Sequence, residues 1–218
     1  MRLVALSDLH GMLPETLPVC DLLLLAGDLC PVEDHHVAYQ AQWLDRDFRA
    51  WLQRVPARKV IGVAGNHDFI FERAPQLVPQ DLPWTYLQDS GVTFEGLKIW
   101  GTPWQPWFYN WAFNGQPDEL RAIWAKIPAG TDVLVVHGPP YGYGDGVPER
   151  RSGLIRHTGC PHLLARIQEL RPRLVVFGHI HEGRGAWQLG PTTLANVTRV
   201  DVAYQPIHPP WTFDLEAA

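Results

Sequence analysis

Five short apolar runs in this chain each lead directly into a cluster of small polar residues. The runs are rich in Leu, Val and Ile and alternate with helical patterns, which is typical of the strands of an α/β sheet. They cover residues 2–7, 21–26, 59–64, 132–136 and 173–177. Ligands of open α/β sheets bind beyond the carboxyl ends of the strands. The sequence therefore predicts an α/β fold in which the five polar clusters surround one crevice.

The segments between these runs complete the expected fold. Apolar residues at helical spacing predict helices over 37–51, 117–127 and 161–170. We expect a hairpin over 92–101, with its turn at Glu95 and Gly96, and a closing antiparallel set from Ala186 onward. No repeat or linker interrupts this pattern, so we expect a single domain over residues 1–218.

Composition and charge exclude several classes of protein. The chain contains 10 tryptophans, too many for a disordered protein, and its formal net charge of −5 disfavours extended contact with a DNA duplex. No run approaches the roughly 20 apolar residues of a membrane span, and the first strand resembles no signal peptide. The three cysteines include no Cys-x-x-Cys pair, which favours a reducing compartment. We therefore expect a cytoplasmic protein that does not engage membranes.

The five polar clusters contain side chains that bind metal ions. Any one cluster alone can be explained as a helix cap, a turn or a buried histidine pair. Five clusters that each follow a strand end are not all explained in this way. Oxygen and nitrogen donors without a thiolate suit Mn, Fe, Zn or Ni. Seven donors are too many for one ion and suit two, which at about 3.5–4 Å apart promote displacement at phosphorus. The donors are Asp8, His10, Asp28, Asn66, His137, His179 and His181.

Two local features would bring these donors together. The Asp-x-His and His-x-His pairs are spaced two residues apart, so on an extended backbone both side chains of a pair point the same way. A glycine precedes three of the seven donors, and its missing Cβ lets the backbone approach an ion or a substrate closely.

Taken together, the clusters resemble the motifs of the calcineurin-like metallophosphoesterase superfamily. These motifs are Asp-x-His, Gly-Asp, Gly-Asn-His-Asp, His and Gly-His-x-His. Residues 86–90, 101–104, 137–140 and 178–183 are similar to the metallophosphoesterase-domain-containing (MPPED) branch and its bacterial members, and the likeness covers nearly the whole chain. The resemblance implies a four-layer αββα sandwich, in which two mixed sheets are flanked by helices.

The resemblance also implies a role for each donor. His67 would not bind metal but would face the scissile phosphate, stabilising charge there or protonating the leaving group. Asp68 stands where the family often has Glu, and His179 is present where one animal branch has Gly, so the ligand set is complete. The first ion would be held by Asp8, His10 and His181, the second by Asn66, His137 and His179, and Asp28 would bridge the two.

Elementary chemistry leads to the same reaction. Two cations lower the pKa of a bridging water, and the resulting hydroxide attacks phosphorus while the metals and His67 neutralise charge on the equatorial oxygens. His67 must be protonated to act as an acid, and a neighbouring carboxylate such as Asp68 would raise its pKa. The ligand types are compatible with Mn²⁺, which the resemblance makes the first choice.

Fewer residues bear on the choice of substrate. Trp104 and Trp107 lie in an aromatic loop whose rings would stack on unpaired bases, worth about 1–3 kcal/mol each. The alternative is a loop packed on its own rings. Arg150, Arg151 and Arg156 would bind further phosphates, or would form a solvated turn without function.

We therefore expect a manganese-dependent phosphodiesterase. Its substrate would be single-stranded DNA or RNA, cut as by an endonuclease, or a 2′,3′-cyclic nucleotide. A phosphomonoesterase or protein phosphatase is the alternative, and it would need a pocket for a dianionic ester. A non-catalytic scaffold that has retained only the fold is a third possibility, against which the complete ligand set argues. The sequence identifies no protein partner.

Overall fold

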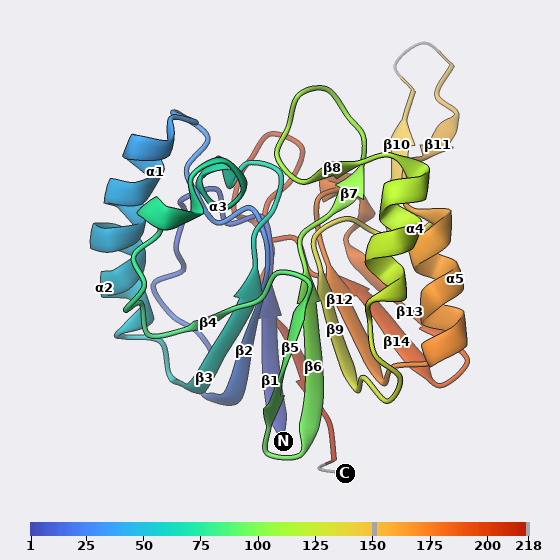
Figure 1. Cartoon of the computed structure of the whole chain (residues 1–218), viewed down its shortest axis with the longest axis horizontal. Helices are drawn as coiled ribbons and strands as arrows, with labels where there is room; N and C mark the ends of the chain where they lie inside the picture. Colours follow the sequence, from blue (N-terminus) through green and yellow to red (C-terminus); the bar gives the residue numbers. More distant parts are fainter. Residues whose placement is uncertain (150–151, 217–218) are drawn as a thin grey trace.

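Two β-sheets pack face to face in the middle of the molecule, and helices cover the outer face of each sheet (Figure 1). The fold is described from a computed structural model, which places residues 1–149 and 152–216. The layers follow the order helix, sheet, sheet, helix. This arrangement confirms the predicted four-layer αββα sandwich.

The first sheet has five strands in the order β15-β1-β2-β3-β4. Strands β1 to β4 are parallel, and β15 pairs antiparallel with β1 at the edge. The strands are β1 (Arg2–Leu6), β2 (Cys20–Ala26), β3 (Ala57–Val63), β4 (Thr85–Tyr86) and β15 (Trp211–Asp214). The three longest parallel strands coincide, to within two residues, with the first three predicted runs.

The second sheet has six strands in the order β13-β14-β12-β9-β6-β5. Its four inner strands are parallel, and an antiparallel strand closes each edge. Glu95 and Gly96 join β5 to β6 with φ of 45° and 88°, as in the type I′ turn expected of a tight hairpin. The strands are β5 (Ser90–Phe94), β6 (Leu97–Thr102), β9 (Val133–Val136), β12 (Leu174–Phe177), β13 (Gly185–Leu189) and β14 (Thr192–Asn196).

The helices lie on the two outer faces (Figure 1). The first sheet is covered by α1 (Val37–Trp43), which continues through a π-helical turn (Leu44–Phe48) into α2 (Arg49–Leu52), and by α3 (Phe69–Arg73). The second sheet is covered by α4 (Pro117–Ala125) and α5 (Pro161–Leu170). Short 3₁₀ turns occur at Pro75–Leu77 and His181–Gly183. Within the described residues, no helix is long and apolar enough to cross a membrane.

Burial on both faces explains why the strands read as continuous apolar runs. In β1, Leu3 and Ala5 pack against the other sheet, whereas Val4 and Leu6 pack under the helices. The same alternation recurs in β2, β9 and β12. Neither face of these strands can take a polar side chain until the strand ends, so the polar donors stand just beyond the strand ends.

The strand ends and their loops form one edge of the sandwich, opposite the N-terminus (Figure 1). Two small ribbons stand at this edge. One consists of β7 (Gln105–Pro106) and β8 (Asn114–Gly115), and the other of β10 (Gly146–Pro148) and β11 (Ile155–His157).

Candidate metal centre and active site

All seven predicted donors follow strand ends at this edge and converge on one small volume. Strands β1, β2 and β3 of the first sheet are followed by four of them, and strands β9 and β12 of the second sheet by the other three. The sheets are packed face to face, so their carboxyl edges bring donors from both sheets together. They are Asp8, His10, Asp28, Asn66, His137, His179 and His181.

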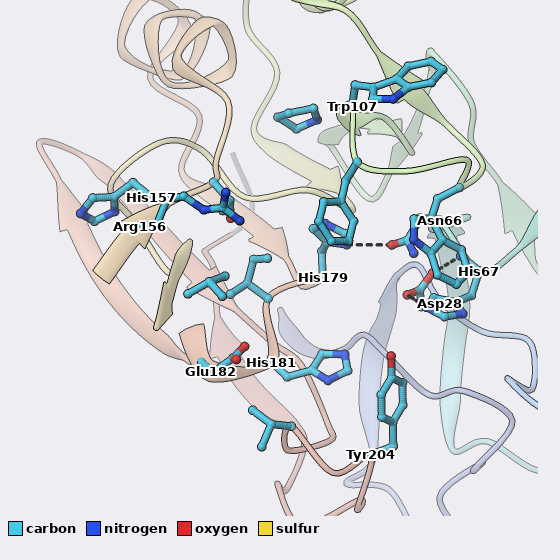
Figure 2. A pocket seen from close by; sticks show the side chains of 17 residues that line it. Asp28, Asn66, His67, Trp107, Arg156, His157, His179, His181, Glu182 and Tyr204 are labelled. Atoms are coloured by element: carbon cyan, nitrogen blue, oxygen red, sulfur yellow. Dashed lines mark hydrogen bonds and ion pairs between the residues drawn. The ribbon is translucent and has the colours of Figure 1, made fainter. Parts of the chain in front are cut away.

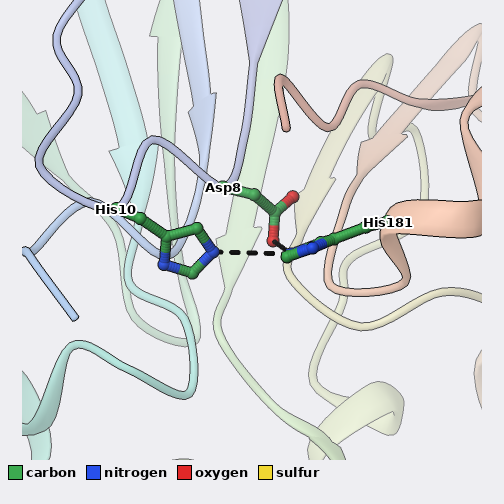
Figure 3. Close-up of side chains that lie close together, drawn as sticks. All are labelled: Asp8, His10 and His181. Carbon is green, nitrogen blue, oxygen red and sulfur yellow. Dashed lines mark hydrogen bonds and ion pairs between the residues drawn. The ribbon is translucent and has the colours of Figure 1, made fainter. Parts of the chain in front are cut away.

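Asp8, His10 and His181 form one group of donors (Figure 3). The Nε2 atom of His181 lies 3.5 Å from Oδ1 of Asp8 and 3.4 Å from Nε2 of His10. One ligand atom from each residue lies within 4.8 Å of the other two, close enough for all three to contact one ion. This is the set predicted for the first metal.

The Asp28 carboxylate lies between this group and the remaining donors. Its Oδ2 is 3.8 Å from Nε2 of His10 and 3.5 Å from Nε2 of His137. On the far side, Oδ1 of Asn66 lies 2.9 Å from Nε2 of His137 and 2.7 Å from Nδ1 of His179. A carboxylate in this position can contact two ions at once.

Backbone carbonyls orient two of the histidines for metal binding. The Nδ1 atom of His137 lies 2.9 Å from the Ala26 carbonyl oxygen, and that of His181 lies 3.1 Å from the Asp201 carbonyl oxygen. When Nδ1–H donates to a carbonyl, Nε2 carries the lone pair that a metal needs. In both residues, Nε2 is the atom that faces the other donors.

The electrostatics of the site favour divalent cations. Burial, followed by the charges of Asp68 and Asp8, raises the pKa of Asp28 well above its usual value. Burial also lowers the pKa of His10 and of His179 to about 3, which keeps both imidazoles neutral, the form that binds metal. Crowded buried carboxylates beside neutral imidazoles are costly unless cations compensate them. The residues present therefore fit a pair of divalent ions.

Left-handed backbone, rather than an extended one, brings the paired donors together. Asp8, His10, Asp28 and His179 have φ of 55°, 46°, 52° and 69°, a region that non-glycine residues adopt at a cost. His181 lies in a 3₁₀ turn. The expectation that two-residue spacing acts through an extended segment was therefore wrong, because the chain must turn sharply as it leaves each strand.

The glycines before Asn66 and His179 make room for a neighbouring loop, whereas their predicted approach to an ion or a substrate stays a prediction. A Cβ atom at Gly65 would overlap the side chain and backbone nitrogen of Asp28, and one at Gly178 would overlap the side chains of Ser7 and Asp8. At both positions two loops from different strands touch. Only glycine leaves room for the neighbouring carboxylate.

His67 lies at the same centre, with its Nε2 4.0 Å from Oδ2 of Asp28. Its geometry with His10 and Asp28 would also permit metal binding, so its position outside the ligand set remains a prediction. Burial, then the charge of His10, lowers the pKa of His67 to about 2. Its Nδ1 is hydrogen-bonded to Nε2 of His35, at 3.0 Å.

Asp68 does not support His67 as expected. Its carboxylate accepts hydrogen bonds from the backbone N–H groups of Leu29, Cys30 and Gly65, at 2.8–3.0 Å for the shortest contact of each. Within the described part of the chain, no hydrogen bond joins it to His67. Asp68 instead ties together the loops after β2 and β3, which carry two of the metal donors.

A pocket of about 500 Å³ opens over the centre (Figure 2). Trp107 and Arg156 line it, and both were predicted substrate contacts. Trp104 lies outside this lining, because its indole N–H donates to Oδ2 of Asp89 at 3.1 Å and its ring packs against Phe113. The predicted contacts Arg150 and Arg151 lie outside the described residues.

Three residues of the site carried no motif that sequence reasoning could use. The ring of Tyr204 lies 4.8 Å from that of His10 and 5.0 Å from that of His181, from a segment with no recognisable pattern. Trp111 lies 4.3 Å from the ring of His67, and its position within the aromatic loop was the only indication. His35 lies outside the five motifs of the sequence.

The fold and the donor set agree with the comparisons to known proteins. The model of the calcineurin-like phosphoesterase family matches residues 1–183, so the chain belongs to this family. Metallophosphoesterase domain-containing protein 1 from Homo sapiens is 37% identical over 98% of this chain and 71% of that protein, as is its Mus musculus counterpart. Family membership supports a phosphoester hydrolase, and the Asp and His clusters suggest a binuclear divalent metal site.

A solved structure shares the architecture at low sequence identity. The phosphopantetheinyl hydrolase PptH from Mycobacterium tuberculosis superposes with a TM-score of 0.57 and 18% identity. The match covers 90% of this chain and 88% of that one. At this identity the likeness shows the fold alone.

Proposed function

We propose that this protein hydrolyses phosphodiester bonds of single-stranded nucleic acid or nucleotides, with two divalent ions, of which Mn²⁺ is our first choice. The observation that carries the proposal is the position of the donor set. Four of the seven donors, Asp28, Asn66, His179 and His181, line a pocket whose walls also present aromatic rings and one arginine. A phosphodiester would place its phosphate over the donors and its bases or sugars against these walls.

The walls of the pocket suit an unpaired base. Trp107 and Phe108 are 55% and 48% exposed, so their faces are open to a ligand rather than packed in the core. Arg156 reaches into the pocket from another side (Figure 2). No ion pair to its guanidinium occurs among the residues that the structure places. A base stacked on Trp107 and a neighbouring phosphate near Arg156 would use both features.

The chain's own residues contribute to the reaction through position. The bound ions would supply an activated water and neutralise charge on the phosphate. His67 directs Nε2 toward the Asp28 carboxylate at the floor of the pocket, and its backbone N–H donates to Oδ1 of the same carboxylate at 2.8 Å. From there the imidazole can donate to an equatorial oxygen of the ester, where charge develops.

We expect His67→Ala to lower kcat for a phosphodiester by about 10²–10⁴-fold, the usual contribution of a positioned acid or donor. Metal content should remain at two ions per chain, because the seven donors are untouched. Metal analysis and steady-state kinetics on the same preparation test this. Loss of one ion would instead make His67 a ligand, and unchanged turnover would remove it from the reaction.

We expect Trp107→Ala to raise KM for a nucleotide substrate by about 5- to 150-fold, which corresponds to the loss of one stacking contact of about 1–3 kcal/mol. Tyr109→Asn is the matched control, because Tyr109 has a left-handed backbone with φ of 49°, which Asn adopts readily. Tyr109 lies in the same loop and is 73% exposed, but it is not part of the pocket wall. Equal effects in both variants would show that the loop, rather than the Trp107 face, binds the substrate.

A closed circle of single-stranded DNA, incubated with Mn²⁺, tests the proposed function directly. A circle has no ends, so conversion to a linear product requires endonucleolytic cleavage, and Asp28→Asn is the control for a contaminating nuclease. An intact circle together with hydrolysis of 2′,3′-cyclic nucleotides would select the second substrate class of the proposal. Hydrolysis of an aryl phosphomonoester but of no diester would reject the proposal in favour of a phosphomonoesterase.

A further inference from the structure

His35 and His67 form a pair of imidazoles beside the metal centre. His35 lies in the loop between β2 and α1, and its Nε2 is 3.0 Å from Nδ1 of His67. Aromatic rings surround the pair: Trp111 lies 5.4 Å from the ring of His35 and 4.3 Å from that of His67, and Phe69 lies 5.2 Å from the ring of His35. This packing leaves both rings little freedom to rotate.

The direction of the hydrogen bond follows from what lies on the other side of His67. Its Nε2 faces Oδ2 of Asp28 at 4.0 Å. When Asp28 is ionised, a proton on Nε2 is attracted by this carboxylate, whereas a lone pair on Nε2 is repelled by it. The favoured arrangement of the neutral ring therefore has the proton on Nε2 and a bare Nδ1, which accepts from Nε2–H of His35.

We infer that His35 is a positioning residue, which donates to Nδ1 of His67 and so holds His67 as the tautomer that presents Nε2–H to the reacting phosphate. The catalytic consequence rests on the proposed function, but the tautomer does not. Asp68, the carboxylate expected beside His67, is bound to backbone N–H groups instead, so a neutral imidazole occupies the partner position.

A pair of substitutions separates hydrogen bonding from packing. His35→Gln keeps an N–H donor on a side chain of similar reach, and His35→Phe keeps an aromatic ring without a donor. With bis(p-nitrophenyl) phosphate and Mn²⁺, we expect His35→Phe to lower kcat about 10- to 100-fold with KM within about twofold. His35→Gln should recover kcat to within about threefold of the native protein. The reverse order, with Phe active and Gln inactive, would overturn the inference in favour of a packing role.

A measurement on the metal-free protein, made at alkaline pH so that Asp28 is ionised, decides the tautomer without any activity. In protein labelled with ¹⁵N-histidine, long-range ¹H–¹⁵N correlations distinguish Nδ1–H from Nε2–H, and the His67→Ala variant identifies the His67 signals. We expect the Nε2–H tautomer of His67 in the native protein. In His35→Phe, we expect the ¹⁵N chemical shift of His67 Nδ1 to move toward the value of an imidazole nitrogen that accepts no hydrogen bond. An Nδ1–H tautomer in the native protein would overturn the inference. If no ester is cleaved, the proposed function fails while this readout still decides the role of His35.

Discussion

Asp28→Asn is expected to lower kcat/KM for a phosphodiester by at least about 10³-fold. The Asp28 carboxylate lies within 3.8 Å of His10 and 3.5 Å of His137, between the two groups of donors. An amide in this place carries no charge to hold two cations, whose joint contribution is several kcal/mol at about 1.4 kcal/mol per tenfold. Elemental analysis should show fewer than two ions per chain. Retention of both ions with near-native activity would show that Asp28 does not bridge.

The same substitution is expected to stabilise the metal-free protein at neutral pH. Burial and the neighbouring charges of Asp68 and Asp8 raise the pKa of Asp28. A carboxyl whose pKa is raised in the native protein contributes fully to the free energy of unfolding at a pH below its unfolded-state pKa, near 3.8. This contribution is lost as the pH rises through the native-state pKa. The advantage of Asn over Asp should therefore grow with pH, as measured by urea unfolding in EDTA.

Asp47→Asn is a suitable control for this experiment. Asp47 forms a surface ion pair with Arg46, so its substitution should change the free energy of unfolding by no more than about 0.5 kcal/mol at any pH. An Asp28→Asn variant that is less stable than the native metal-free protein at pH 8 would contradict the account of a costly buried carboxylate.

Acid is expected to destabilise the metal-free protein steeply. Burial lowers the pKa of His10 and His179 to about 3 and that of His67 to about 2, whereas each unfolded histidine titrates near 6.5. A histidine whose pKa is lowered in the native protein contributes stability at a pH above about 6.5, and this stability is lost as the pH falls toward the native-state pKa. Between these two pKa values, each such histidine lowers the free energy of unfolding by about 1.4 kcal/mol per pH unit. The raised pKa values of Asp28 and Asp68 oppose part of the effect.

Urea unfolding in EDTA between pH 7.5 and 4.5 measures this slope, and His67→Ala provides an internal test. Removing one buried neutral histidine should reduce the slope by about 1.4 kcal/mol per pH unit. With saturating Mn²⁺ the dependence on pH should steepen, because the ions bind only deprotonated ligands. A transition midpoint independent of pH in EDTA would contradict the burial of these imidazoles in the neutral form.

The strands and the donors could be predicted from the sequence because both depend on local pattern. A strand buried on two faces must be apolar throughout, so its end is visible where Asp8 or His137 interrupts the run. The parallel order then brings the ends together without further information. Partnerships between loops are different, because they depend on how segments far apart in the chain pack.

Three residues whose contacts differ from those predicted illustrate this dependence on loop packing. Asp68 binds the loop after β2, and His35 takes the place beside His67 where Asp68 was expected. The packing of two loops sets this choice, and the residues in contact are 38 and 32 positions apart in the chain. Trp104 and Trp107 share one aromatic loop, yet Asp89 draws the first away from the pocket. No periodicity distinguishes the two tryptophans.

The left-handed donors affect how knock-out variants of this protein should be chosen. Alanine in that conformation adds about 1–2 kcal/mol of backbone strain, whereas Asn adopts it readily. An alanine at Asp8, His10 or Asp28 would thus report lost chemistry and a displaced loop at once. Asparagine keeps the backbone conformation, so the difference in free energy of unfolding between paired Ala and Asn variants of the metal-free protein would measure how firmly each loop resists relaxing.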